Sequence, residues 1–117
     1  MAKKKETNPS ITWNGEKYDL IFNLNVMEEI QEKYGSVEKW GELVEEAEEP
    51  KAKDIKFGFT AMLNEGIDIY NETSDKKREF FTEKQVGRII SQIGLQNAAH
   101  TLNTAVVEST KSDEKNA

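Results

Sequence analysis

The sequence predicts an α+β fold, with an N-terminal β-hairpin packed on a bundle of about four or five α-helices. The hairpin is indicated by Asn14-Gly15, which lies between two apolar segments and suits a type I′ turn, where both central residues have positive φ. The bundle is indicated by apolar residues that recur at helical spacing from residue 27 to residue 106. Capping residues and glycines divide this region into separate helices.

The predicted hairpin occupies residues 11–22. Its turn sets three cross-strand pairs, namely Trp13–Glu16, Thr12–Lys17 and Ile11–Tyr18. One face is apolar and is formed by Ile11, Trp13, Tyr18, Leu20 and Phe22. We expect this face to pack on the third helix. Because a two-stranded hairpin leaves two unpaired edges, we also expect it to extend a sheet between subunits of a homo-oligomer.

The first two helices follow directly. Asn25 is the expected N-cap of the first, with Glu28 completing a capping box, and Gly35 is the expected C-terminal residue. Ser36 is the expected cap of the second helix, which ends before Pro50. Its predicted apolar stripe consists of Val37, Trp40, Leu43, Val44 and Ala47.

The third helix, predicted over residues 52–71, has the strongest periodicity. Its buried stripe consists of Ile55, Phe59, Met62, Leu63, Gly66, Ile67 and Tyr70. Gly66 on this stripe predicts a close approach by another element. Phe57 lies on the opposite side, with Ala61, Asn64 and Asp68.

Two more helices complete the bundle. Thr82 and Gln85 predict a capping box, with Phe81 packing across it onto Val86. The fourth helix ends at Gly94, and a fifth carries Leu95, Ala98, Ala99, Leu102, Ala105 and Val106. We therefore predict a disordered leader at residues 1–10, a single α+β domain at 11–107 and a disordered tail at 108–117.

Composition excludes several classes of function. The 117 residues carry a net charge of −6, and no basic face suited to nucleic acid is visible, so no nucleic-acid partner is expected. No apolar run is long enough to span a bilayer, so no membrane partner is expected. The absence of cysteine excludes disulfides and thiolate metal sites, and is typical of an intracellular protein.

No constellation of residues indicates catalysis. His100 is the only histidine, and no serine or acid lies at a spacing that would activate it or share a metal with it. The glutamates between residues 28 and 49 fall on polar helix faces, whereas acid–base work requires a buried carboxyl with a raised pKa. The sequence therefore predicts a protein without enzymatic activity, cofactor or metal.

Three apolar residues fall outside the predicted core faces and are the candidate partner-binding residues: Ile21, Phe57 and Val107. In so polar a chain they favour a protein-binding surface.

The segment NGEKYDLIFNLNVMEEIQEKYGS resembles the opening of the tail assembly chaperones of long-tailed (siphovirus-type) bacteriophages and prophages. In that family a hairpin of the form NGK-x-Y-x-L-x-F leads into a helix ending in EE-x-x-G-S. The resemblance is sharpest over Trp13 to Ser36 and continues, more loosely, to about Ala105. It implies a chaperone that binds the tape measure protein and keeps it soluble until tail-tube subunits polymerise around it.

The same resemblance implies the cytoplasm of the bacterial host as location, absence from the mature virion, and the tail-tube protein as a further partner. It also implies a frameshifted longer form of the chain. Glu114-Lys115-Asn116 would contain the slippery sequence A AAA AAC with one choice of codons, but lysine and asparagine are common enough to produce this by coincidence.

Two other functions remain open on the sequence alone. A structural tail or connector subunit of the virion could have this size and polarity. A small acidic inhibitor that mimics nucleic acid is the second alternative, although its carboxylates would be concentrated on one surface. Here lysines are interspersed, for example Lys33, Lys39, Lys51, Lys53 and Lys56.

Overall fold

The computed structural model describes residues 8–46 and 51–116. This part of the chain is an α+β domain with an antiparallel hairpin followed by five α-helices, as predicted. In chain order the elements are β1 (Ser10–Trp13), β2 (Glu16–Asp19), α1 (Leu24–Tyr34), α2 (Val37–Gly41), the π-helical turn η1 (Glu42–Glu46), α3 (Ala52–Thr73), α4 (Glu83–Ile93) and α5 (Leu95–Asn116).

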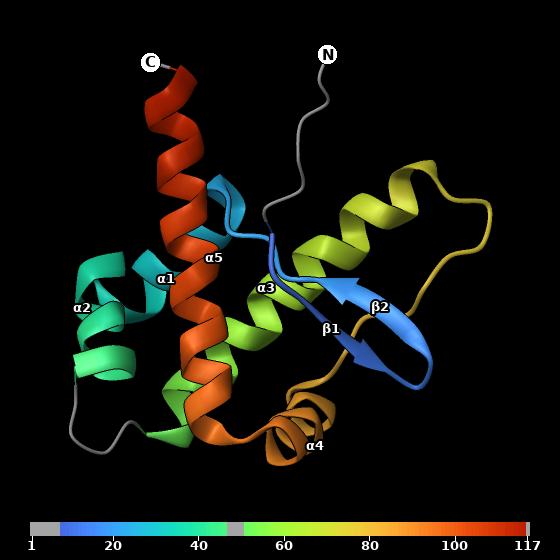
Figure 1. Cartoon of the computed structure of the whole chain (residues 1–117), viewed down its shortest axis with the longest axis horizontal. Helices are drawn as coiled ribbons and strands as arrows, with labels where there is room; N and C mark the ends of the chain where they lie inside the picture. Colours follow the sequence, from blue (N-terminus) through green and yellow to red (C-terminus); the bar gives the residue numbers. More distant parts are fainter. Residues whose placement is uncertain (1–7, 47–50, 117) are drawn as a thin grey trace.

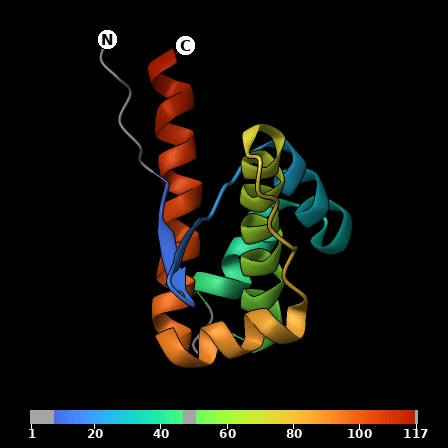
Figure 2. The same ribbon diagram turned by 90° about the vertical axis from the view of Figure 1, so that its right-hand side faces the viewer.

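Helix α3 is central, because α1, α4, α5 and β2 all contact it. The hairpin lies beside α5 (Figure 1). In the view turned by 90°, α1 lies on the side of α3 opposite the hairpin and α5 (Figure 2). Helix α4 crosses below α3 and α5 in the same view. Most of the deeply buried side chains form one core, which includes Leu20, Ile30, Ile55, Phe59, Met62, Leu63, Val86, Ile89 and Leu102.

The hairpin has the predicted register, with all three cross-strand pairs as expected. Asn14 and Gly15 have φ values of 53° and 81°, which is the backbone that a type I′ turn requires. The backbone N–H of Ile21 donates to the carbonyl of Met62 at 3.2 Å. This bond and the burial of Leu20 and Phe22 confirm that the hairpin packs on α3.

Helix α1 begins earlier than predicted. Asn23, not Asn25, is the N-cap, because its extended backbone lets the side-chain oxygen accept from the N–H of Val26 at 3.3 Å. The amide of Asn25 instead donates to Glu65 at 3.2 Å. The predicted end at Gly35 is confirmed by its φ of 94°.

The second helix is shorter than predicted. Ser36 caps it as expected, accepting from the N–H of Lys39 at 3.0 Å, but α2 gives way to the π-helical turn η1 after Gly41. A π turn has more residues per turn than an α-helix, so the side chains that follow Gly41 are rotated about the helix axis and no longer continue the apolar stripe. Leu43, predicted to be buried, is consequently 40% exposed. Ala47 lies outside the described residues.

The boundaries of α3 and α4 follow the sequence closely. Helix α3 begins at Ala52 as predicted, and both bonds of the Thr82–Gln85 capping box are present. Tyr70, placed on the buried stripe by its spacing, is instead 38% exposed. The reason is that its ring packs against the guanidinium of Arg78, whose Cζ lies 4.0 Å from the ring centroid.

Secondary structure extends beyond the predicted domain of residues 11–107 at both ends. Strand β1 begins at Ser10, inside the predicted leader, and residues 1–7 lie outside the described part. Helix α5 continues to Asn116, so residues 108–116 of the predicted disordered tail are helical. No glycine or proline follows Gly94 to stop the helix.

Candidate functional site: an acidic groove along helix α3

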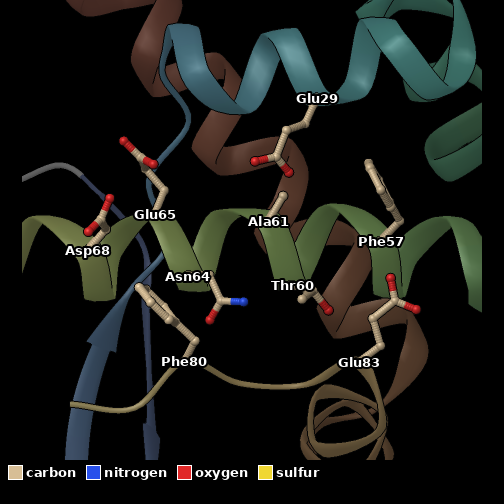
Figure 3. A pocket seen from close by; sticks show the side chains of 9 residues that line it. All are labelled: Glu29, Phe57, Thr60, Ala61, Asn64, Glu65, Asp68, Phe80 and Glu83. Carbon is tan, nitrogen blue, oxygen red and sulfur yellow. The ribbon is translucent and has the colours of Figure 1, made fainter.

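A groove of about 290 Å³ runs along the side of α3 that faces away from the core stripe (Figure 3). Helix α1 forms one wall, and the other is formed by the segment 74–82, which we call the strap, with the start of α4. The groove is lined by Glu29, Phe57, Thr60, Ala61, Asn64, Glu65, Asp68, Phe80 and Glu83. The face that the sequence assigned to Phe57, Ala61, Asn64 and Asp68 is therefore the floor of this groove.

Two asparagines on α3 hold the strap in place. The side chain of Asn64 donates to the carbonyl of Phe81 at 2.9 Å and accepts from its N–H at 2.8 Å. Asn71 does the same with Arg78, at 2.9 and 2.8 Å. Each amide satisfies both backbone groups of one strap residue, as a neighbouring strand would.

The side chain of Arg78 ties the strap to the hairpin. Its guanidinium forms an ion pair with Glu16 at 3.2 Å and donates to the carbonyl of Lys17 at 3.1 Å. It also lies over the rings of Tyr18 and Tyr70, with centroid distances of 4.5 and 4.0 Å. The strap is thus anchored on two sides.

Two aromatic side chains provide the apolar surface of the groove. Phe80 is 54% exposed although it lies between the two anchored residues Arg78 and Phe81. Its exposure is therefore fixed by an ordered backbone. Phe57 is half-buried and packs edge-on against Tyr34, with the ammonium of Lys33 at 5.1 Å from its ring centroid.

Four carboxylates from three helices surround these rings: Glu29, Glu65, Asp68 and Glu83. Within residues 8–46 and 51–116, none of them forms an ion pair. Glu65 accepts from the amides of Asn23 and Asn25, at 2.8 and 3.2 Å. The pKa of Glu29 is raised by burial and by the neighbouring charges of Glu65 and Glu32. The groove is therefore a site of negative potential with little internal compensation.

The structure places the three sequence-predicted binding residues on different elements. Ile21, between β2 and α1, is half-buried next to Gly66. Val107 is 41% exposed on α5, and only Phe57 lines the groove. Sequence reasoning missed Phe80. The available signal was the pair Phe80-Phe81, of which only Phe81 was needed to pack at the helix start.

A second hollow of about 290 Å³ lies between α2, η1 and α5. It is lined by Val37, Glu38, Trp40, Gly41, Glu42, Val44, Glu45, Leu102, Asn103 and Val106. Its carboxylates, from Glu38, Glu42 and Glu45, make it a useful comparison for the acidic groove.

Asp54 is a buried acid that the sequence analysis did not identify. Burial raises the pKa of its carboxyl, but hydrogen bonds from the Tyr34 hydroxyl (2.7 Å) and the Lys53 ammonium (3.1 Å) outweigh this, and the pKa is lowered. Its backbone carbonyl accepts from the indole N–H of Trp40 at 3.0 Å. A carboxylate held ionised in this way connects α1, α2 and α3 and is a structural group.

Among the described residues, no group of three or more His, Asp or Glu side chains could hold a metal ion. His100 is exposed on α5 and does not line the groove. None of the helices in the described ranges combines the length and the apolar character needed to cross a bilayer. Comparison of the chain with protein-family models, with curated proteins and with solved structures finds no match.

Proposed function

We propose that this chain is a tail assembly chaperone, which binds the tape measure protein of a long-tailed phage and keeps it soluble until the tail tube polymerises. It would act in the cytoplasm of the bacterial host and be absent from the finished particle. The observation that carries the proposal is the acidic groove, where an exposed aromatic side chain is held on an ordered strap. Apolar side chains grouped in one hollow with a polar rim, as Phe57, Ala61 and Phe80 are here, are typical of a surface that binds another protein.

The resemblance on which the client is named covers Trp13 to Ser36. In the structure this segment runs from the hairpin turn to the cap of α2 and includes Asn23 and Glu29, which border or line the groove. The family-like segment therefore contributes to the candidate site as well as to the core.

The chemistry of the groove suits reversible binding. Phe57 and Phe80 offer apolar contact to side chains of a helical client, while the carboxylates around them remain in water and add mainly to encounter rate and selectivity. A small apolar contact with a charged rim gives moderate affinity, which lets tube subunits displace the chaperone.

Co-expression with the neighbouring long open reading frame tests the proposal. We expect the product of that frame to become more soluble and to co-purify with this chain. The variant Phe80→Ala removes exposed apolar surface without unfolding the chain. With this variant, the soluble yield of the co-expressed product should fall. Recovery of this chain as an abundant component of purified particles would contradict the proposal and identify a structural tail or connector subunit.

Capture of a DNA-binding host protein, lost at moderate salt, would instead favour the acidic inhibitor.

The partners also include a second copy of the chain and, by resemblance, the tail-tube protein and a frameshifted longer form. The sheet in the described residues has two strands, so edge-to-edge pairing with another copy could extend it. Light scattering that gives a strict monomer at high concentration would contradict the homo-oligomer. The codon at Lys115 tests the frameshift, because AAG would interrupt the slippery sequence.

A further inference from the structure

We propose that the groove between α1, α3 and the strap is the docking site for a client segment in which apolar side chains are flanked by lysine or arginine. This inference rests on the proposed function for the existence of a client. The position of the site and the chemistry of the segment come from the groove itself.

The size of the groove limits what enters it. Its volume of about 290 Å³ lies just below the range for small-ligand pockets, roughly 300–1,000 Å³. It accommodates one or two large side chains of a helix lying across it, in contact with Phe57, Ala61 and Phe80.

The carboxylates of the groove favour basic residues on either side of the apolar side chains of that segment. Glu29, Asp68 and Glu83 come from three different helices and all line the groove, with Asp68 and Glu83 toward its opposite ends (Figure 3). The raised pKa of Glu29 reflects burial and repulsion from Glu65 and Glu32, and a bound cation would relieve that repulsion. A segment with acidic flanks would add to it.

The chain itself contains an example of the expected contact. The Lys33 ammonium lies over the Phe57 ring in a separate, adjoining hollow, which shares Glu29 and Phe57 with the groove and is also lined by Glu32. A lysine or arginine of the client can make the same kind of contact with Phe80, which is open to solvent.

The groove is also preorganised. Phe80 is held between two strap residues whose backbone groups are bound by Asn64 and Asn71. Binding therefore requires little ordering of the protein, so that even a small contact area yields measurable affinity.

A labelled model peptide tests this proposal with the full-length chain. The probe is a synthetic amphipathic helix of about 18 residues (five turns) made of leucine and lysine, and its counterpart has glutamate at every lysine position. Fluorescence anisotropy at low and at moderate salt measures both. We expect binding of the basic peptide that weakens with salt, and no binding of the acidic one. Failure of the basic peptide to bind would overturn the proposal.

Two triple variants with the same change in net charge locate the site. The first, Glu29→Gln with Asp68→Asn and Glu83→Gln, should weaken binding of the basic peptide by about tenfold, since exposed ion pairs contribute modestly and add up. The second, at the other hollow, is Glu38→Gln with Glu42→Gln and Glu45→Gln. It should leave binding unchanged. Equal effects of the two triples, or none from the first, would overturn the assignment to this groove.

A second pair of variants, Phe80→Ala and its control Leu24→Ala, tests the apolar contact. Phe80→Ala should weaken the basic peptide about tenfold, the loss expected when an exposed aromatic anchor is removed. Leu24→Ala, at a side chain that is 75% exposed and does not line the groove, should leave binding unchanged. Equal losses in the two variants would overturn the role of Phe80.

Co-expression of the same variants with the long open reading frame separates this inference from the proposed function. If the client is kept soluble equally well by the groove triple and by the control triple, the groove inference fails and the chaperone function stands. If peptide binding follows the groove but the client is not kept soluble by the unmodified chain, the chaperone function fails and the peptide site stands.

Discussion

Two glycines of α3 allow close approaches from different kinds of neighbour. At Gly66 a Cβ would collide with the backbone carbonyl oxygen of Asp19, at the end of β2. At Gly58 it would collide with the ring of Trp40. The first contact joins a helix to a strand backbone, and the second joins a helix to a side chain held by its own hydrogen bond. The two ends of α3 are thus packed by different means, and they should respond differently to substitution.

The largest effect is expected at Gly66. A methyl group there requires the backbone of β2 to move, which would detach the hairpin from α3. We expect Gly66→Ala to lower the free energy of unfolding by about 3 kcal/mol, the upper part of the range for overpacking. Urea denaturation followed by circular dichroism measures it.

The matched control for this substitution is Gly87→Ala in α4. There the nearest atom to a Cβ is the flexible Lys56 Cδ at 3.6 Å. Alanine has the higher helix propensity, so this variant should gain up to about 1 kcal/mol. A Gly66→Ala variant as stable as the unmodified chain would contradict the close approach of the hairpin.

A smaller loss is expected at Gly58, because a ring can shift where a strand cannot. We expect Gly58→Ala to cost about 2 kcal/mol, since the displaced Trp40 loses packing and its bond to the Asp54 carbonyl. Trp40→Phe removes the ring atoms that collide. The double variant should therefore be less destabilised than the sum of the two single variants, whereas additive losses would show that the ring and the methyl group do not meet.

The smallest of the three effects concerns Asp54, at the Gly58 end. Asp54→Asn keeps an acceptor for Tyr34 but loses the charge, and should cost about 1.5 kcal/mol at pH 7. Because the folded-state pKa is lowered below 3.8, this stability is present above that value and is lost as pH falls through the folded-state pKa. The difference between the variant and the unmodified chain should thus shrink as urea denaturation is repeated toward pH 2.

Other groups also titrate in this range, so the informative quantity is that difference. Glu29 contributes in the opposite direction, because its folded-state pKa is raised. A difference that stays constant with pH would show that Asp54 has the same pKa in the folded and unfolded chain. The Gly66 end has no such buried carboxylate, so Gly66→Ala should not alter the pH dependence.

Features of α3 and its neighbours that depend on local sequence patterns could be predicted, whereas those that depend on contacts between distant residues could not. The hairpin register, the role of Gly66 and the capping box at Thr82 depend on local patterns, and the structure confirms them. Gly58 was not identified, because its close neighbour Trp40 lies on another helix, α2, and no local pattern in the sequence pairs the two residues. The N-cap was misplaced by two residues, since asparagines stand at both 23 and 25 and both side chains donate to Glu65 in the fold. Only Asn23 also accepts from a backbone N–H of the helix, that of Val26.

The candidate site was predicted in part. Periodicity placed Phe57, Ala61, Asn64 and Asp68 on one face of α3, but could not show that α1 and the strap enclose that face. The exposure of Phe80 follows from the pairing of Asn64 and Asn71 with strap residues. Such pairing between a helix and an irregular segment has no period in the sequence.

That pairing fixes the number of residues that the strap must have between its two anchored positions. Asn64 and Asn71 are seven residues apart, or roughly 10.5 Å along a helix, and their partners Phe81 and Arg78 are three residues apart, or roughly 10 Å of extended chain. The two spans match only at this spacing. Insertion or deletion of one residue between positions 78 and 81 would leave one amide without its partner. Lengthening the chain between Ser74 and Lys77 would preserve both pairs, so that length variation among homologous chains should be confined to that stretch.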